Sequence, residues 1–201
     1  MQIFLKSKII FIAAFSLAFY GCVGIGAPIL DPWTNSQNVD GLLAHNRPLP
    51  AELLIEATME NCKRKNDELG LALAYKMFAN FLESSTVKNW EYHYRRDGFI
   101  IDKTVTFDNR LDKAREYWYK SLHLYQKNNA HAEESNIYVN IATSDFFIKN
   151  DPQTACQNLD LSLEAHVKFR KDHPDKPIIM DKRFKDFPDY IKAAKEQFEC
   201  K

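Results

Sequence analysis

The stretch from Ala51 to Asp151 contains no proline, and its only glycines are Gly70 and Gly98. Proline breaks the interior of a helix and glycine weakens it, so a long stretch with so few of either favours α-helix. Apolar residues in this stretch recur every three or four positions, which is the period of a helix with one buried face. The sequence therefore predicts a mainly α fold over residues 50–201, built from antiparallel helical hairpins.

Apolar spacing and capping residues predict six helices. Asp67 is expected to cap the second helix, and Asp151 is expected to cap the fifth because Pro152 follows it at the first helical position. The six are expected over 50–65, from Asp67 onward, over 110–127, over 131–149, from Pro152 onward and over 187–199. The core-facing residues expected in the first three are Leu53, Leu54, Ala57, Thr58 and Cys62; Leu71, Ala74, Tyr75, Phe78 and Leu82; and Leu111, Ala114, Trp118, Ser121, Leu122 and Tyr125.

Two of the expected helix pairs share an arrangement of small and large residues. In one pair Ala142 precedes the series Ala155, Leu159 and Ser162; in the other Ala72 precedes the series Ala114, Trp118 and Ser121. This pattern resembles the tetratricopeptide repeat over residues 67–170, in which small residues let two helices approach closely. The resemblance implies stacked helical hairpins with a concave face that binds a peptide or helix of a partner. The alternative is an irregular helical bundle.

Residues 89–107 interrupt the helical pattern. They include the sequence WEYHYRRDGFIIDKTVTF, which is rich in aromatic and β-branched residues and has Asp97-Gly98 at its centre. An Asp-Gly pair between alternating apolar residues is a typical signal for a two-residue β-turn. The sequence predicts a β-hairpin insertion here, with a helix that continues to Tyr94 as the alternative. Aromatic and arginine side chains often dominate binding surfaces, so the candidate partner-binding residues are Tyr92, Tyr94, Arg95, Arg96 and Phe99.

The N-terminus has the features of an export signal. Lys6 and Lys8 precede an uncharged apolar run over residues 9–20, which is too short to span a membrane. The sequence Phe19-Tyr20-Gly21-Cys22 then resembles the lipobox of bacterial lipoproteins. The resemblance implies removal of residues 1–21 and acylation of Cys22. The alternative is an ordinary secretory signal peptide with an incidental cysteine.

The lipobox resemblance also implies where the protein is located. Val23 follows the cysteine, and the absence of Asp at this position implies an outer-membrane lipoprotein that faces the periplasm. Residues 22–49 contain three prolines and three glycines, which predicts a lipidated N-terminus followed by an extended tether. The domain organisation expected is thus a signal peptide over 1–21, a tether over 22–49 and a helical domain over 50–201.

Three cysteines remain besides Cys22, namely Cys62, Cys156 and Cys200. An exported protein folds in an oxidising compartment, where one disulfide can form and one cysteine is left over. Cys156 lies in the first turn of a predicted helix and Cys200 lies at the end of the chain, so we expect this pair to be bonded. The alternative is three buried free thiols.

The sequence offers no catalytic constellation. It contains no glycine-rich phosphate loop, G-x-S-x-G, H-E-x-x-H or C-x-x-C motif. His131 and Glu134 are close enough in sequence to share a metal, but a solvated polar first turn explains them better; His93 and Asp102 would form a cross-strand polar pair in the expected hairpin. We therefore assign no catalytic residue, no metal site and no cofactor.

Charge excludes one class of partner. The chain has 27 Lys and Arg and 27 Asp and Glu. Loss of residues 1–21 removes two lysines and no acid, which leaves a net charge of −2 and no basic run suited to nucleic acid. The leading hypothesis is a non-catalytic protein-binding module on a membrane, such as an adaptor for envelope assembly. The alternative is an immunity lipoprotein that neutralises a secreted antibacterial toxin, for instance a type VI lipase or amidase effector; an enzyme is the third hypothesis.

Overall fold

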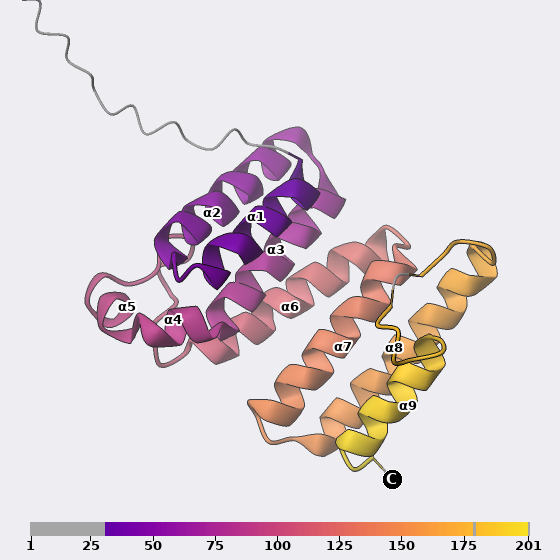
Figure 1. The fold of residues 1–201 in the computed structure, drawn as a ribbon. Coiled ribbons are helices and arrows are strands. Elements are labelled where there is room, and N and C mark those ends of the chain that lie inside the picture. The colour runs from indigo at the N-terminus through magenta and orange to yellow at the C-terminus, as the bar shows by residue number, and fades with distance from the viewer. Residues whose placement is uncertain (1–30, 179, 201) are drawn as a thin grey trace, which may run out of the picture.

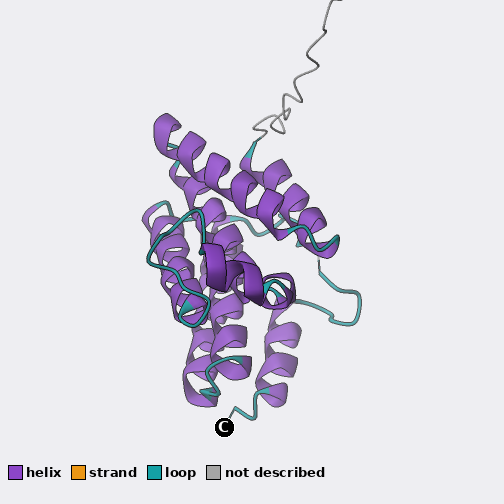
Figure 2. Ribbon diagram, turned by 90° about the vertical axis from the view of Figure 1, so that its left-hand side faces the viewer, coloured by secondary structure: helices purple, strands orange, loops and turns teal. Residues whose placement is uncertain are grey.

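The computed structural model describes residues 31–178 and 180–200, and this part of the chain is mainly α, as predicted. It forms helices and loops and contains no β-strand (Figure 2). The helices in chain order are α1 (Pro32–Ala44), α2 (Pro48–Lys65), α3 (Glu68–Glu83), α4 (Ser85–Asn89), α5 (Glu91–Asp97), α6 (Arg110–Lys127), α7 (His131–Phe147), α8 (Pro152–Asp172) and α9 (Phe187–Gln197). None of these helices is both long and apolar enough to cross a membrane.

Short polar residues begin the helices. The Asp67 side chain accepts a hydrogen bond from the Gly70 amide (2.8 Å), and the Asp151 side chain accepts one from the Thr154 amide (3.0 Å). Each carboxylate satisfies a backbone donor that has no partner within the helix, which is why the expected starts of α3 and α8 are observed.

Asparagine residues in the left-handed conformation make four of the turns between helices. Asn46 lies between α1 and α2, Asn66 between α2 and α3, Asn129 between α6 and α7, and Asn150 between α7 and α8, all with φ of 51–55°. Asparagine adopts this conformation at lower cost than other side-chain-bearing residues, because its short amide can bond to nearby backbone. These four turns set successive helices side by side.

The expected small-residue positions are helix contacts. Helix α3 packs along α6 and α7 packs along α8 (Figure 1). The buried Ser121 hydroxyl donates to the Ala72 carbonyl (2.7 Å), and the Ser162 hydroxyl donates to the Ser135 carbonyl (2.8 Å). Hydroxyls that reach the backbone of the neighbouring helix show that each pair is closely packed.

The core has two parts. The larger cluster joins helices α1 to α7 and includes the fully buried Trp118 and Tyr125; the smaller joins α7, α8 and α9 around Leu159 and Ile191. The expected inward face is correct for most of α6, but α2 is rotated from expectation, because Leu53 is 51% exposed while Ile55 is buried. Ile55 instead of Leu53 therefore fills the space against α1 and α3.

The predicted β-hairpin over residues 89–107 is wrong. Helices α4 and α5 occupy its first half, and an irregular loop follows Gly98 (φ 73°), whose conformation ends α5. A one-turn spacing joins Glu91 to Arg95 (2.6 Å) by an ion pair, which favours helix in this segment. The predicted pair of His93 and Asp102 does not form, because His93 contacts Asp97 (3.0 Å) instead.

The tether prediction is wrong for residues 32–44, which form helix α1. The Asp31 side chain accepts from the amides of Trp33 (3.0 Å) and Thr34 (3.1 Å), and Pro32 occupies the first helical position. Val39 is buried where α1 packs on α2 and α3. The prolines of this region start helices instead of extending the chain. The signal peptide 1–21, Cys22 and the tether up to residue 30 lie outside the described residues.

A disulfide joins Cys156, in the first turn of α8, to Cys200, just after α9. This is the pair that the sequence analysis favoured over three free thiols. Cys62 is the free cysteine of the described residues; it is buried, and burial raises the pKa of its thiol to about 11. Cys62 is therefore a protonated core residue, and the disulfide fixes the C-terminal helix to α8.

Candidate functional site

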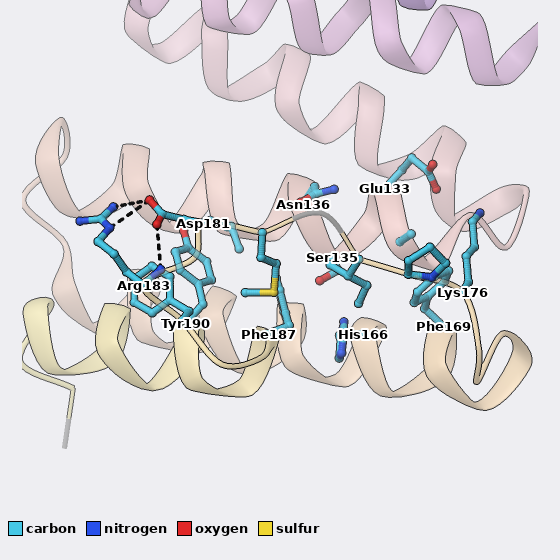
Figure 3. A pocket seen from close by; sticks show the side chains of 16 residues that line it. Glu133, Ser135, Asn136, His166, Phe169, Lys176, Asp181, Arg183, Phe187 and Tyr190 are labelled. Atoms are coloured by element: carbon cyan, nitrogen blue, oxygen red, sulfur yellow. Dashed lines mark hydrogen bonds and ion pairs between the residues drawn. The ribbon is translucent and has the colours of Figure 1, made fainter.

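A groove lies between α7, α8, the start of α9 and residues 176–178 and 180–184 of the connection that precedes α9 (Figure 3). Its volume is about 630 Å³, which lies in the usual range for ligand sites, and a second hollow of about 460 Å³ adjoins it on the α8–α9 side. Its wall on α7 includes Ser135, Asn136 and Val139, and its opposite wall includes Met180. We call this hollow the α7–α9 groove.

Aromatic rings line the groove in a continuous row. His166 stacks on Phe187 with 4.4 Å between ring centroids, and Phe187 contacts Tyr190 at 5.8 Å. The row extends in both directions, from His166 through Phe169 to His173 and from Tyr190 to Phe184. Rings at these distances support one another. His166, Phe169 and Phe187 are buried and form the floor of the groove, whereas Phe184 and Tyr190 are half-buried and partly accessible.

The charged groups at the rim are already engaged within the chain. Arg170 donates to the carbonyl of Lys176 (2.7 Å), which holds the segment 173–186 against α8. Arg183 pairs with Asp181 (2.8 Å), and the Lys176 ammonium lies 5.7 Å from the centre of the Phe169 ring. The rim therefore contributes hydrogen-bonding capacity without a strong field of either sign.

The polar groups inside the groove are held in structural roles. Burial, together with the nearby Arg170 charge, lowers the pKa of His166, so this imidazole is neutral near pH 7. The hydroxyls of Ser135 and Ser162 each bond to a carbonyl of the other residue. Neither hydroxyl has a histidine as hydrogen-bond partner, so the described groove residues form no nucleophile–base pair.

Another small hollow of about 70 Å³ lies between α1, α3, α6 and α7, and it shares the lining residues Glu133 and Asn136 with the groove. Trp33 lines it and is 56% exposed, and Lys76 lines it from α3. Burial lowers the pKa of Lys76, although the nearby carboxylates of Asp40 and Glu133 oppose this effect.

The residues predicted to bind a partner do not form one surface. Tyr94 and Phe99 are each 1% exposed and stack on one another with ring centroids 4.4 Å apart, so the prediction is wrong for these two. Tyr92 is 77% exposed, Arg95 pairs with Glu91 and Asp108, and Arg96 pairs with Asp97. For Tyr92, Arg95 and Arg96 a role in binding stays a prediction.

A buried carboxylate connects Tyr94 to the loop that follows it. Glu52 on α2 is fully buried and accepts hydrogen bonds from the amides of Ile100 (2.6 Å) and Ile101 (3.4 Å). Burial raises the pKa of Glu52, and burial together with the adjacent Glu52 raises the pKa of Tyr94 far above its usual value. This arrangement anchors the irregular loop to the core, which is a structural function.

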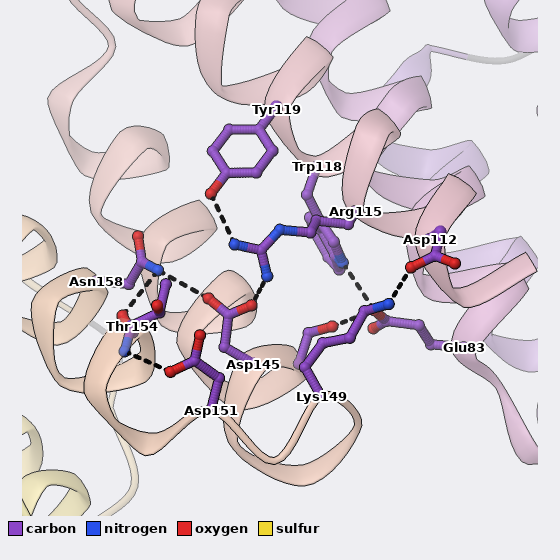
Figure 4. Close-up of polar contacts among 11 residues, drawn as sticks. Glu83, Asp112, Arg115, Trp118, Tyr119, Asp145, Lys149, Asp151, Thr154 and Asn158 are labelled. Carbon is purple, nitrogen blue, oxygen red and sulfur yellow. Dashed lines mark hydrogen bonds and ion pairs between the residues drawn. The ribbon is translucent and has the colours of Figure 1, made fainter.

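A second polar cluster joins the two halves of the fold (Figure 4). The fully buried Asp145 on α7 forms an ion pair with Arg115 on α6 and accepts a hydrogen bond from Asn158 on α8 (2.9 Å). Glu83 on α3 accepts from the Ser144 hydroxyl (2.7 Å), and burial raises the pKa of Glu83. Each of these groups bonds to a neighbouring helix, so the cluster fixes the position of α7 and α8 against α3 and α6.

The remaining candidates for metal binding are also engaged elsewhere. His131 contacts Glu134 through Nδ1 (2.9 Å) in the first turn of α7. Within residues 31–178 and 180–200, no three His, Cys, Asp or Glu side chains gather as a metal site would require.

No protein-family model, curated protein or solved structure matches the chain. Sequence reasoning missed the groove, because its lining comes from three separate segments of the chain. The one local signal was the pair Pro174 and Pro177, which marks a long non-helical connection between two amphipathic helices.

Proposed function

We propose that this chain is a non-catalytic, membrane-anchored lipoprotein that binds a protein partner through the α7–α9 groove, as an adaptor in assembly of the cell envelope. The anchor is the acylated Cys22, and the helical domain faces the periplasm from the outer membrane. The observation that carries the proposal is the row of aromatic rings along an open groove. Large rigid rings in a concave surface are the side chains that most often supply binding energy in protein interfaces.

The charges around the groove support a protein partner more than a small charged substrate. At the rim Arg183 pairs with Asp181, one acid (Glu133) and one base (Lys176) complete the charged lining, and Asn136 offers both a donor and an acceptor beside the apolar wall. Interfaces typically combine such an apolar centre with a polar rim. A segment of a partner chain with apolar side chains and a free backbone matches both features.

Capture of the acylated protein from its native envelope tests the binding surface. Val139→Lys places a charged side chain in the α7 wall of the groove, and Val167→Lys makes the same change at an exposed position of α8 outside the groove. We expect a stoichiometric partner to be recovered with the unmodified chain and with Val167→Lys, and to be lost with Val139→Lys. Equal recovery with both variants would place binding elsewhere.

The identity of that partner decides between an adaptor and an immunity protein. Recovery of envelope-assembly components supports the adaptor, whereas recovery of one secreted toxin would make the chain an immunity lipoprotein.

The anchor has a separate test. Cys22→Ser should abolish metabolic labelling with palmitate and release the protein from the membrane fraction. Absence of palmitate labelling in the unmodified chain, or equal labelling of the Cys22→Ser variant, would overturn the lipoprotein assignment.

A further inference from the structure

We propose that the hollow of about 460 Å³ beside the α7–α9 groove binds carboxylates, and that the partner of the groove is therefore an acidic peptide segment. Apolar side chains of that segment occupy the groove, and a neighbouring Asp or Glu binds at Lys182 and Lys185. The inference rests on the proposed function of the groove and adds the chemical class of its partner. We call this second hollow the basic hollow.

Three cationic side chains line the basic hollow without an acidic partner. Lys182 and Lys185 are exposed and form no ion pair with a described residue. Arg170 donates to the carbonyls of Pro174 (3.3 Å) and Lys176 (2.7 Å), which orients its guanidinium but leaves its charge uncompensated. A ligand in the basic hollow therefore meets three free positive charges.

The acidic residues of the basic hollow are already engaged. Arg183 binds Asp181 through Nε (3.0 Å) and through a terminal nitrogen (2.8 Å), which neutralises that carboxylate (Figure 3). Asp186 caps α9 and accepts a hydrogen bond from the Asp189 amide (2.9 Å); Asp189, outside the lining, accepts one from the Lys185 amide (3.1 Å). With Arg183 counted, four basic and two acidic side chains surround the hollow, an excess of two positive charges that favours an anion.

The basic hollow and the groove share one floor. His166 and Phe187 line both, and their rings stack with centroids 4.4 Å apart. An extended peptide advances about 3.3–3.6 Å per residue, so a single segment crosses this ring stack within a few residues. We therefore expect the acid about two to four residues from the apolar side chains that the groove holds.

The carboxylate belongs to a side chain and not to the end of a peptide. Sites that hold a terminal carboxylate use several backbone amides that converge on it. At the start of α9, Pro188 has no amide hydrogen, and the Asp189 amide already bonds to Asp186. Lysine side chains are flexible point charges, which suit an Asp or Glu within a chain.

The polar wall of the groove favours a peptide over an anionic lipid. Asn136 on α7 offers a donor and an acceptor close to Val139, and both can bond to the backbone of an extended peptide. An acyl chain would cover this amide without a hydrogen bond, which costs free energy.

Selection from a library of short random peptides tests the inference. Each peptide is held between two linkers, so that none has a free carboxyl end, and the bait is the chain from residue 22 with Cys22→Ser, which carries no lipid. We expect enrichment of apolar residues with an Asp or Glu near them. Enrichment of neutral or basic peptides, or no enrichment, would overturn the inference.

Two double variants with the same change of charge locate the binding. Lys182→Ser with Lys185→Ser removes cations of the basic hollow, whereas Lys168→Ser with Lys171→Ser removes two exposed lysines of α8 that line neither hollow. Affinity for an enriched peptide, measured by fluorescence polarisation, should fall about tenfold with the first variant, because two exposed ion pairs together contribute roughly that factor. It should stay unchanged with the second, and an equal loss in both would overturn the inference.

Changes in the peptide identify the group that is bound. Replacement of its acid by the corresponding amide should weaken binding to the unmodified chain about tenfold and should have no effect on the Lys182→Ser, Lys185→Ser variant. A peptide shortened so that its free carboxyl end replaces that acid should bind as weakly as the amide form; full affinity would contradict the side-chain assignment. Binding of dodecanoate, with no peptide enriched, would instead assign the site to an anionic amphiphile.

Val139→Lys separates this inference from the proposed function. It should abolish binding of the enriched peptide, because it changes the wall of the groove. If neutral peptides are enriched and Val139→Lys abolishes their binding, the groove remains the binding surface and the basic hollow is wrong. If acidic peptides bind in the groove but Val139→Lys leaves capture of the envelope partner unchanged, the carboxylate site stands and the proposed function fails.

Discussion

Removal of the disulfide should destabilise the protein by an amount that depends on the number of residues between the two cysteines. Cys156 and Cys200 are 44 residues apart in sequence. In the chain-entropy model, a cross-link around a loop of that length restricts the unfolded chain by about 4 kcal/mol at 25 °C. The double variant Cys156→Ser and Cys200→Ser should therefore lower the free energy of unfolding by about 4 kcal/mol, a large fraction of the stability of an ordinary domain.

Urea unfolding followed by circular dichroism checks this value, in a Cys22→Ser background without lipid. The oxidised parent chain treated with a reductant is the matched control, because it loses the same cross-link without a change of sequence. Both should show a lower midpoint with a similar dependence on urea. An unchanged free energy of unfolding in both samples would refute the reasoning. A separate early transition would mean that α9 detaches alone, since its contact with α8 would then depend on the bond.

Three other changes test the packing and the buried charges, each by urea unfolding. Trp118→Ala should lower the free energy of unfolding by about 3–5 kcal/mol because the indole is buried. Tyr119→Ala, at the neighbouring position, should lower it much less because this side chain is 41% exposed, and equal effects would mean that the assigned face of α6 is wrong. Asp145→Ala should cost about 1–3 kcal/mol because it leaves the buried Asn158 amide without its acceptor and the half-buried Arg115 without its ion-pair partner. Asp112→Ala, at an exposed ion pair, should cost under about 1 kcal/mol, and an equally small effect at Asp145 would argue against the buried network. Burial raises the pKa of Glu52 in the folded chain, so its contribution to stability is present in acid and is lost as the pH rises through that folded pKa. Glu52→Gln should flatten the fall of stability with rising pH above the ordinary pKa of a glutamate, about 4, and an unchanged dependence would contradict the assignment.

Local sequence signals were sufficient for most helices, because their ends depend on neighbouring residues. Helix α6 occupies the predicted range 110–127, and α3 and α8 start after the aspartates that cap them. Asp31-Pro32 carries the same signal as Asp151-Pro152, and it starts α1 in the same way. The prediction of an extended tether there failed because the prolines of the region were interpreted as a sign of extended chain. A proline that directly follows a capping aspartate instead starts a helix.

The β-hairpin prediction failed for a different reason. Aromatic residues at alternate positions near Asp97-Gly98 fit a strand, but the spacing of Glu91 and Arg95 fits a helix equally well. Only the packing of Tyr94 and Phe99 into the core selects the helix, and that packing depends on Glu52, which is distant in sequence. The groove was beyond prediction for the same reason, since its walls join segments that no local pattern connects.

The polar cluster between the two halves of the fold also bears on how far the halves can move relative to one another. The N-terminal helices and the groove are connected mainly through the contact of α6 with α7. Arg115 and Asp145 bridge this contact, and Lys149 pairs with Asp112 at its edge. Two ion pairs, together with the hydrogen bond from Ser144 to Glu83, therefore cross the contact, and the two halves separate only if all three are broken. The two groups of helices should therefore move together as one rigid body, with little bending at the contact between α6 and α7.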